Sequence, residues 1–177
     1  MDRTKLDALF GPFKPARFLF LFVATYTVLH ALYFAFPDRV LRDLVHHYCI
    51  LTPGAQLIRL ADPGEPVVAG GGKLSSPRAT LSIVRGCDGA GVTFLLIAAV
   101  LAFSAGWKYK LLGAAGALVL TYALNELRVV GLYFVAAYHS EWFGLLHDYL
   151  VPTLLIVACC IFFAAWAGWA KSSGPAT

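Results

Sequence analysis

The sequence predicts an all-α membrane protein that crosses the bilayer several times, and three observations lead to this fold class. Of its 177 residues, 59% are hydrophobic and 14% are charged, whereas soluble domains contain about 45–50% and about 25%. The mean hydropathy is +0.72. Four hydrophobic stretches meet or approach the roughly 20 residues that a helix needs to span a bilayer. This composition excludes a disordered chain and argues against a soluble enzyme. A net charge of only +4, without a basic stripe, excludes a nucleic-acid partner.

The four expected spans cover about residues 18–36, 88–106, 111–137 and 149–170 of a single integral membrane domain, residues 1–177. The first contains no charged residue and is too long for a cleavable signal peptide. It ends at Pro37-Asp38, which is a helix stop. The second reaches full length only if residues 87–89 lie at its outer edge. The fourth is interrupted by Pro152 near its start.

Basic residues near the ends of the spans set the expected orientation, because cytoplasmic flanks carry an excess of Lys and Arg. They occur in three short flanking segments: Arg3, Lys5, Lys14, Arg17, Lys108, Lys110 and Lys171. We therefore expect both termini in the cytoplasm and the loops at 37–86 and 138–147 outside. The long outer loop holds six basic residues too, which four acidic residues offset. Trp107, Trp166 and Trp169 would then form an aromatic belt at the inner interface.

The long outer loop divides into a helical part and a strand part. Between residues 38 and 60, apolar and polar positions alternate at helical spacing. This pattern predicts a helix that lies on the membrane surface and is broken near Pro53-Gly54. Further on, Gly70-Gly71-Gly72 separates residues 66–68 from an alternating segment at 79–84. This arrangement predicts a β-hairpin that leads directly to Cys87.

Ionisable residues inside or beside the spans are the candidates for function, because each is costly in a bilayer unless it is paired or functional. At about 1.5 Å per residue, Arg128 lies roughly 25 Å into the third span, close to the outer surface of a core about 30 Å thick. Cys87 lies at the outer end of the second span and His147 at the outer end of the fourth. All three therefore reach the same level. Asn125 shares the Arg128 face of its helix at i, i+3 spacing, and Glu126 points elsewhere.

A thiol, a guanidinium and an imidazole at one depth are the groups that acyl transfer requires. A cysteine reacts as a thiolate, which a neighbouring Arg or protonated His favours. We expect Cys87 as the nucleophile, Arg128 as the donor that stabilises the oxyanion, and His147 as the acid that protonates the leaving amine. Three polar neighbours are candidate supporting or substrate-binding residues: Asn125, Asp88 and Asp148.

Each of these residues also has a structural interpretation. A cysteine in a membrane protein is more often a packing residue than a nucleophile. Arg128 could snorkel outward as an anchor, or pair with a partner inside the membrane, in which case the chain is a non-enzymatic membrane assembly subunit. The pair His147-Asp148 could be a plain helix start, with its acid near the positive end of the helix dipole.

Two further clusters lie on the outer side. His46, His47 and Cys49 could bind zinc with Cys87 or His147, but their spacing matches no standard ligand set. We therefore expect no metal and no cofactor. Cys49 and Cys87 face the same oxidising side, where a disulfide between them would block the expected nucleophile. This possibility stays open at the level of the sequence.

The order of three short segments, with spans between them, resembles the exosortase/archaeosortase family. The segments are Arg85-Gly86-Cys87-Asp88-Gly89, Asn125-Glu126-Leu127-Arg128 and His147-Asp148. The forms Cys87-Asp88-Gly89 and Phe143-x-x-x-His147, together with the small size, are most similar to the short exosortase H type. The resemblance covers the chain from about residue 67 to the end.

The resemblance implies a membrane-embedded cysteine peptidase or transpeptidase in the inner membrane of a bacterium, with its active site on the periplasmic side. It implies the same three roles for Cys87, Arg128 and His147. Its substrates would be exported proteins that end in a short motif, a transmembrane helix and a basic tail. Cleavage would pass through a thioacyl intermediate, which a cell-envelope amine or water resolves. The other expected partner is membrane lipid.

Overall fold

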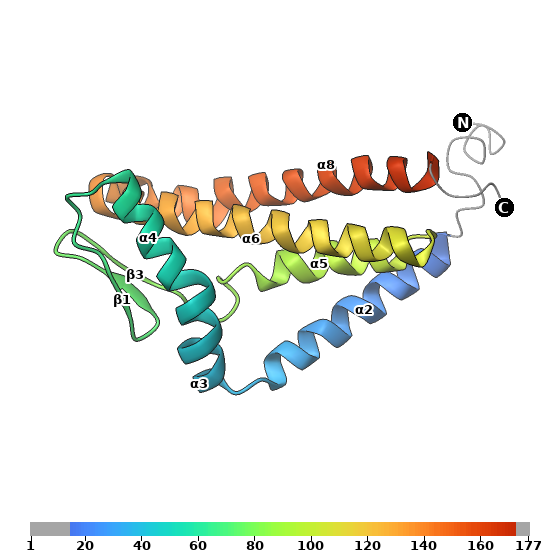
Figure 1. The fold of residues 1–177 in the computed structure, drawn as a ribbon, viewed down its shortest axis with the longest axis horizontal. Coiled ribbons are helices and arrows are strands. Elements are labelled where there is room, and N and C mark those ends of the chain that lie inside the picture. Colours follow the sequence, from blue (N-terminus) through green and yellow to red (C-terminus); the bar gives the residue numbers. More distant parts are fainter. Residues whose placement is uncertain (1–14, 173–177) are drawn as a thin grey trace.

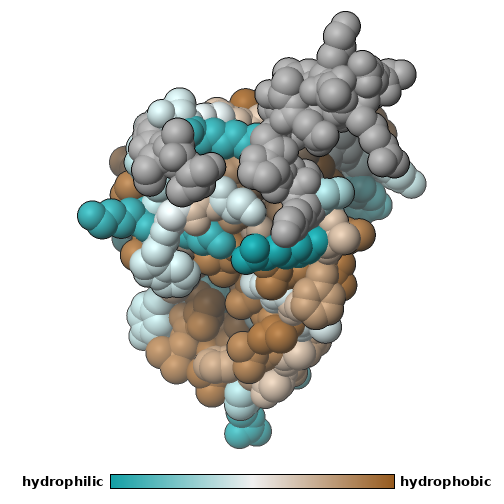
Figure 2. Space-filling model, turned by 90° about the vertical axis from the view of Figure 1, so that its right-hand side faces the viewer, coloured by the Kyte–Doolittle hydropathy of each residue, from teal (hydrophilic) through white to brown (hydrophobic). Residues whose placement is uncertain are grey.

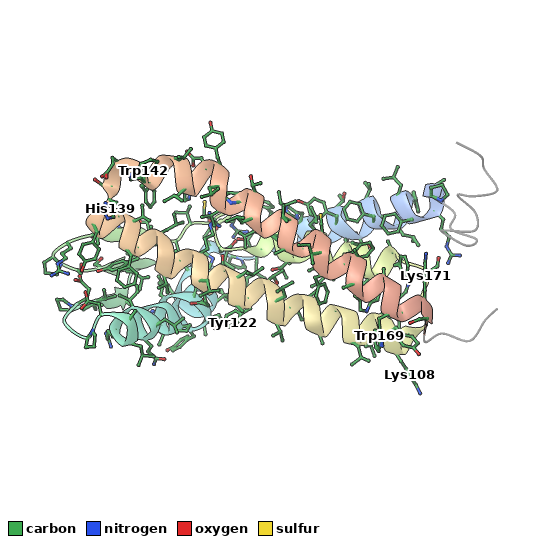
Figure 3. The ribbon with its side chains drawn as sticks, turned by 90° about the horizontal axis from the view of Figure 1, so that it is seen from above. Lys108, Tyr122, His139, Trp142, Trp169 and Lys171 are labelled. Atoms are coloured by element: carbon green, nitrogen blue, oxygen red, sulfur yellow. The ribbon has the colours of Figure 1, made fainter. Side chains whose placement is uncertain are left out.

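Helices form most of the computed structural model, which describes residues 15–172. Three long helices run between the two ends of the molecule: α2 (Pro15–Ala35), α6 (Trp107–Tyr138) and α8 (Val151–Ser172). The shorter helix α5 (Ala90–Ala102) packs among them (Figure 1). A small sheet and a crossing helix lie at one end of this bundle, which we call the sheet end. Lys108 and Lys171 lie at the other end, which we call the lysine end (Figure 3).

The all-α membrane fold class is confirmed, with one difference in the number of spans. Among the described residues, three helical segments are long and apolar enough to cross a membrane: Pro15–Ala35, Trp107–Tyr138 and Ser140–Ser172. The expected second span is shorter, because α5 has 13 residues, about 20 Å against a hydrocarbon core of about 30 Å. It begins after Gly89, whose φ of +82° is not helical, and ends at the extended residue Phe103. Much of its far half is buried among the long helices.

A continuous helix crosses the sheet end (Figure 1). It consists of α3 (Asp38–Val40), the π-helical segment η1 (Leu41–Leu51) and α4 (Thr52–Ala61). The predicted break near Pro53-Gly54 is wrong. Pro53 lies where the π-helical segment η1 passes into α4, and the helix continues through it. Gly54 is buried and faces Glu126 of α6, since a Cβ there would lie 3.5 Å from Oε2 of that carboxylate.

The predicted hairpin is one part of a three-stranded antiparallel sheet with the order β1-β2-β3. Its strands are β1 (Val68–Gly70), β2 (Lys73–Ser75) and β3 (Thr80–Ser82). The direct pairing of 66–68 with 79–84 that the sequence suggested is wrong, because β2 lies between them. Gly71 and Gly72 form the turn between β1 and β2 with φ of +57° and +78°, as a mirror-image hairpin turn requires.

The sheet, the crossing helix and α6 share one hydrophobic core. Its fully buried members include Leu51, Ile58, Leu74 and Tyr133, which come from all three of these parts. Such a core fixes the sheet end to α6, the helix that carries Arg128. The segment that carries Cys87 follows β3 directly, so its position is set by the same core.

Small residues on α6 let α8 approach closely near the lysine end. A Cβ at Gly116 would lie 3.0 Å from the ring of Phe162, and one at Gly113 would overlap the ring of Trp166. Trp166 is therefore buried at 7% exposure and does not belong to the expected aromatic belt. Trp169 does lie at the lysine end, beside Lys108 and Lys171 (Figure 3).

The lysine end has a mixed surface. Viewed from that end, hydrophilic side chains lie across the upper half and a mostly hydrophobic region lies below them (Figure 2). The basic residues Arg3, Lys5 and Lys14, which the orientation argument also uses, fall outside the described residues.

Candidate active site at the sheet end

The segment between β3 and α5 carries Cys87 in a tight turn. Gly86 and Gly89 flank it with φ of +89° and +82°, a region that residues with a Cβ rarely adopt. The backbone N–H of Cys87 donates to the carbonyl of Val84 at 3.0 Å. Gly89 also leaves room for α6, since a Cβ there would lie 2.7 Å from Oδ1 of Asn125. The two glycines thus allow the turn and its close contact with α6.

Arg128 contacts the same turn. Its Nη1 donates a hydrogen bond of 3.2 Å to the backbone carbonyl of Cys87. Its Nε is buried and has no hydrogen-bond partner among the described residues. Because Asn125 packs against Gly89, one turn of α6 holds the turn at two points. Two of the three expected catalytic residues therefore lie together.

His147 lies on the π-helical segment η3 (Leu146–Leu150), which follows η2 (Ser140–Trp142) and α7 (Phe143–Leu145). Its Nδ1 lies 2.7 Å from Oδ1 of Asp148, and its ring stacks on Phe143 with 5.4 Å between centroids. Within residues 15–172, it makes no hydrogen bond to Cys87 or Arg128. The contact with Asp148 leaves Nε2 as the nitrogen available for proton transfer.

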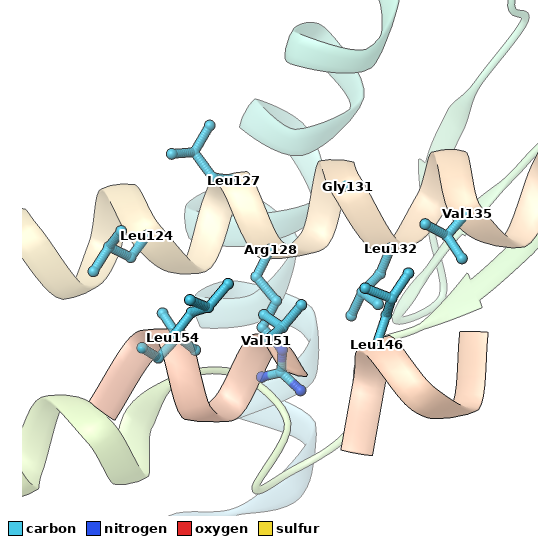
Figure 4. Close-up of a pocket in the computed structure, with 10 residues that line it drawn as sticks. Leu124, Leu127, Arg128, Gly131, Leu132, Val135, Leu146, Val151 and Leu154 are labelled. Atoms are coloured by element: carbon cyan, nitrogen blue, oxygen red, sulfur yellow. The ribbon is translucent and has the colours of Figure 1, made fainter. Parts of the chain in front are cut away.

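A cavity of about 290 Å³ lies between α6 and α8. Arg128 is the only charged residue among the described residues that line it. Its side chain extends from α6 past Val151 of α8 (Figure 4). The other lining residues are Leu124, Leu127, Gly131, Leu132, Val135, Leu146, Val151, Leu154 and Leu155. His147 stands between two of these, Leu146 and Val151, so its segment borders the same cavity as the guanidinium.

Asp88 has partners that the sequence did not indicate. Its Oδ2 accepts a hydrogen bond from the Tyr33 hydroxyl and lies 2.9 Å from Nε2 of His46. Its Oδ1 accepts one from the N–H of Ala90 at 3.2 Å. The side chains of His46 and Asp88 are only 3% and 4% exposed. The only sequence signal for this contact was His46 on the inward face of the crossing helix. Such a histidine is compatible with many partners.

Arg85 ties the same turn to the first span. Its guanidinium donates to Oδ1 of Asp38 at 2.6 Å and to the carbonyl of Phe36 at 2.7 Å. It also lies 4.9 Å from the ring centroid of Tyr33. The turn that carries Cys87 is therefore held by three separate elements, namely α2, η1 and α6.

The zinc and disulfide interpretations gain no support from these contacts. The His46 imidazole is paired with Asp88, and residues 15–172 contain no group of three His, Cys, Asp or Glu side chains placed to hold a metal. All four cysteines lie in the described part of the chain and are free.

A family model described as "Transmembrane exosortase (Exosortase_EpsH)" matches residues 8–166 of the 177. Neither a curated protein nor a solved structure matched the chain. The family match includes the turn with Cys87, Arg128 and His147, and it covers the described helices except the last turns of α8. The model's description names EpsH and does not mention the short exosortase H type, so that likeness stays a prediction. The chain belongs to the transmembrane exosortase family.

Proposed function

We propose that this protein is a membrane-embedded cysteine peptidase or transpeptidase that cleaves C-terminal sorting signals of exported proteins. Family membership supports a general role in membrane protein sorting. The observation that carries the finer proposal is the hydrogen bond of 3.2 Å from Arg128 to the Cys87 carbonyl. It fixes a cation beside the residue that would become the nucleophile.

The reaction has two acyl-transfer steps. The Cys87 thiolate attacks the carbonyl carbon of the scissile peptide bond, and a C–S bond forms. The Arg128 guanidinium stabilises the resulting oxyanion by hydrogen bonding and charge. The C–N bond then breaks while His147 gives a proton to the leaving amine nitrogen, which produces a thioester. An amine or water next attacks the thioester, His147 accepts its proton, and the C–S bond breaks to return the thiolate.

The location in the membrane follows from the same proposal. With both termini in the cytoplasm of a bacterial cell, the sheet end and Cys87 face the periplasm. The substrates are exported proteins that end in a short motif, a transmembrane helix and a basic tail. Such a helix holds the scissile segment at the outer interface, where Cys87 and Arg128 lie.

The test is intact-mass analysis of a co-expressed exported protein with this type of C-terminus. We expect the wild type to remove the substrate's terminal helix, and the Cys87→Ala variant to leave it in place. Cys49→Ala is the matched control, because Cys49 is an exposed, free cysteine on the same end and should process normally. The new C-terminal mass separates hydrolysis from transfer to an amine.

Equal processing by wild type and Cys87→Ala would remove Cys87 as nucleophile. The alternative is a non-enzymatic assembly subunit in which Arg128 pairs inside the membrane. It predicts a silent Cys87→Ala substitution, together with loss of a co-purifying partner in Arg128→Ala.

A further inference from the structure

We propose that the cavity between α6 and α8 binds an extended segment of the substrate, with one backbone carbonyl at Arg128. We call this cavity the α6–α8 groove. The inference rests on the proposed function, because the bound segment would contain the scissile bond. It adds the place, the conformation and the length of the recognised segment.

The first argument is that Arg128 has donors without acceptors. A guanidinium carries five N–H donors. In the described part of the chain, the Arg128 guanidinium donates a hydrogen bond to the Cys87 carbonyl. Its Nε is buried without a partner. A buried donor that stays unpaired is costly, so an occupant of the groove that brings an acceptor is favoured.

The second argument concerns which occupant brings that acceptor. Lipid chains carry none, and the carbonyls inside a transmembrane helix are used by its own hydrogen bonds. An extended peptide leaves one free carbonyl per residue. A lipid phosphate could also reach a guanidinium, but the leucine and valine side chains that line most of the groove suit apolar side chains. The chemistry therefore favours an extended, mainly apolar peptide.

The third argument gives the length of the bound segment. The lining residues of α6 run from Leu124 to Val135, a rise of roughly 16 Å at about 1.5 Å per residue. An extended chain advances about 3.3 Å per residue, so about five residues fit. Arg128 lies about 6 Å from the Leu124 end, which places roughly two residues on that side of the carbonyl and three on the other.

A pair of glycine variants tests the groove by filling it. Gly131 lines the groove and Gly168 of α8 does not. A Cβ at either position would meet nothing within 4 Å, so both tolerate a larger side chain. We expect Gly131→Leu to reduce processing by about tenfold or more, as in a pocket that loses its fit. Gly168→Leu should process like the wild type.

The reactivity of Cys87 controls for misfolding. N-ethylmaleimide should label Cys87 at the wild-type rate in both glycine variants, because a Cβ at either position would meet nothing within 4 Å. Processing by Gly131→Leu at the wild-type level would overturn the groove as the binding site.

Photo-crosslinking tests occupancy without catalysis. In the Cys87→Ala protein, p-benzoylphenylalanine replaces Leu127, a residue that lines the groove, and the same replacement at Ile161 is the control. The two positions are 66% and 64% exposed. We expect Leu127 to give an adduct with the co-expressed substrate, mapped to the segment before its transmembrane helix. Ile161 should give none.

The outcomes separate the two proposals. Adducts only with lipid, or only with the substrate's transmembrane helix, would overturn the inference. Processing by the wild type without a substrate adduct at Leu127 would retain the proposed function and reject the groove. An adduct in a system where the wild type processes nothing would retain the groove and reject the function.

Discussion

Arg128 donates its hydrogen bond to the backbone of the turn that it is proposed to serve. Its hydrogen bond ends on the carbonyl of Cys87, which is present whatever side chain stands at that position. A Cys87→Ala variant should therefore keep Arg128 in place and remove only the sulfur. The Arg128→Ala variant removes both a proposed oxyanion donor and a support of the turn, so its loss of activity is harder to interpret.

His147 has a matched control at the same end of the molecule. Both His147 and His139 face an acidic neighbour, with 2.7 Å to Asp148 and 3.6 Å to Glu141. We expect His147→Gln to lower the processing rate by roughly 100-fold or more, because a general acid–base group contributes about that much. His139→Gln should leave the rate near that of the wild type. Similar rates for the two variants would contradict the acid–base role, and the measurement is the initial rate of substrate processing.

At the level of residues, the sequence predicted that Cys87 and Arg128 lie at the same depth, but it did not predict the partners of Asp88. The first follows from counting depth along two antiparallel helices, since the rise per residue is fixed. The second requires the position of the crossing helix, because His46 reaches Asp88 only through a tertiary contact. Nothing in the local sequence around His46 specifies that contact.

The long elements were predictable for a related reason. Hydrophobic runs of about 20 residues mark spans without regard to packing, and α2, α6 and α8 follow them. The short strands were not predictable in this way. Strand β2 has only three residues, and its central place in the sheet depends on pairing with both neighbours. The π-helical form of η1 was not predicted either, because the sequence pattern is analysed with the α-helical period of 3.6 residues.

The sheet is fixed to α6 by a buried acid, which predicts a pH dependence of stability. Glu65 lies 2.7 Å from the Tyr133 hydroxyl and 2.8 Å from Nη1 of Arg78. Hydrogen bonds from Ser76 and Tyr133, with the nearby Arg78 charge, hold the pKa of Glu65 below its usual value. A depressed pKa stabilises the fold above the unfolded pKa of about 4.3, and this stabilisation is lost as the pH falls through the folded pKa.

Thermal unfolding in detergent micelles between pH 7 and pH 3 measures this effect. When the pH is lowered below about 4.3, we expect the Tm of the wild type to decrease. Glu65→Gln should start from a lower Tm at pH 7 and fall less steeply. Glu141→Gln is the control, because Glu141 is exposed and its loss should preserve the wild-type slope. Parallel curves for wild type and Glu65→Gln would rule out the buried carboxylate as the source of the slope.

The orientation of the whole molecule can be tested at the two ends of α6. Lys108 and His139 lie at opposite ends of the bundle (Figure 3). In a cysteine-free background, we expect a membrane-impermeant maleimide to label His139→Cys in intact cells. Lys108→Cys should be labelled only after permeabilisation. The opposite pattern would reverse the orientation, and labelling of both in intact cells would show that α6 does not span the membrane.

The brevity of α5 has a consequence for how two unlike reactants meet. The helix is shorter than the hydrocarbon core by roughly 10 Å, and the turn with Cys87 directly precedes it. Irregular backbone is stable at such depth only when protein encloses it or water reaches it. The turn with Cys87 is irregular backbone of this kind, so within a bilayer it would need protein or water around it. Under the proposed function, a substrate held by its transmembrane helix and a hydrophilic acceptor would both have to reach this turn.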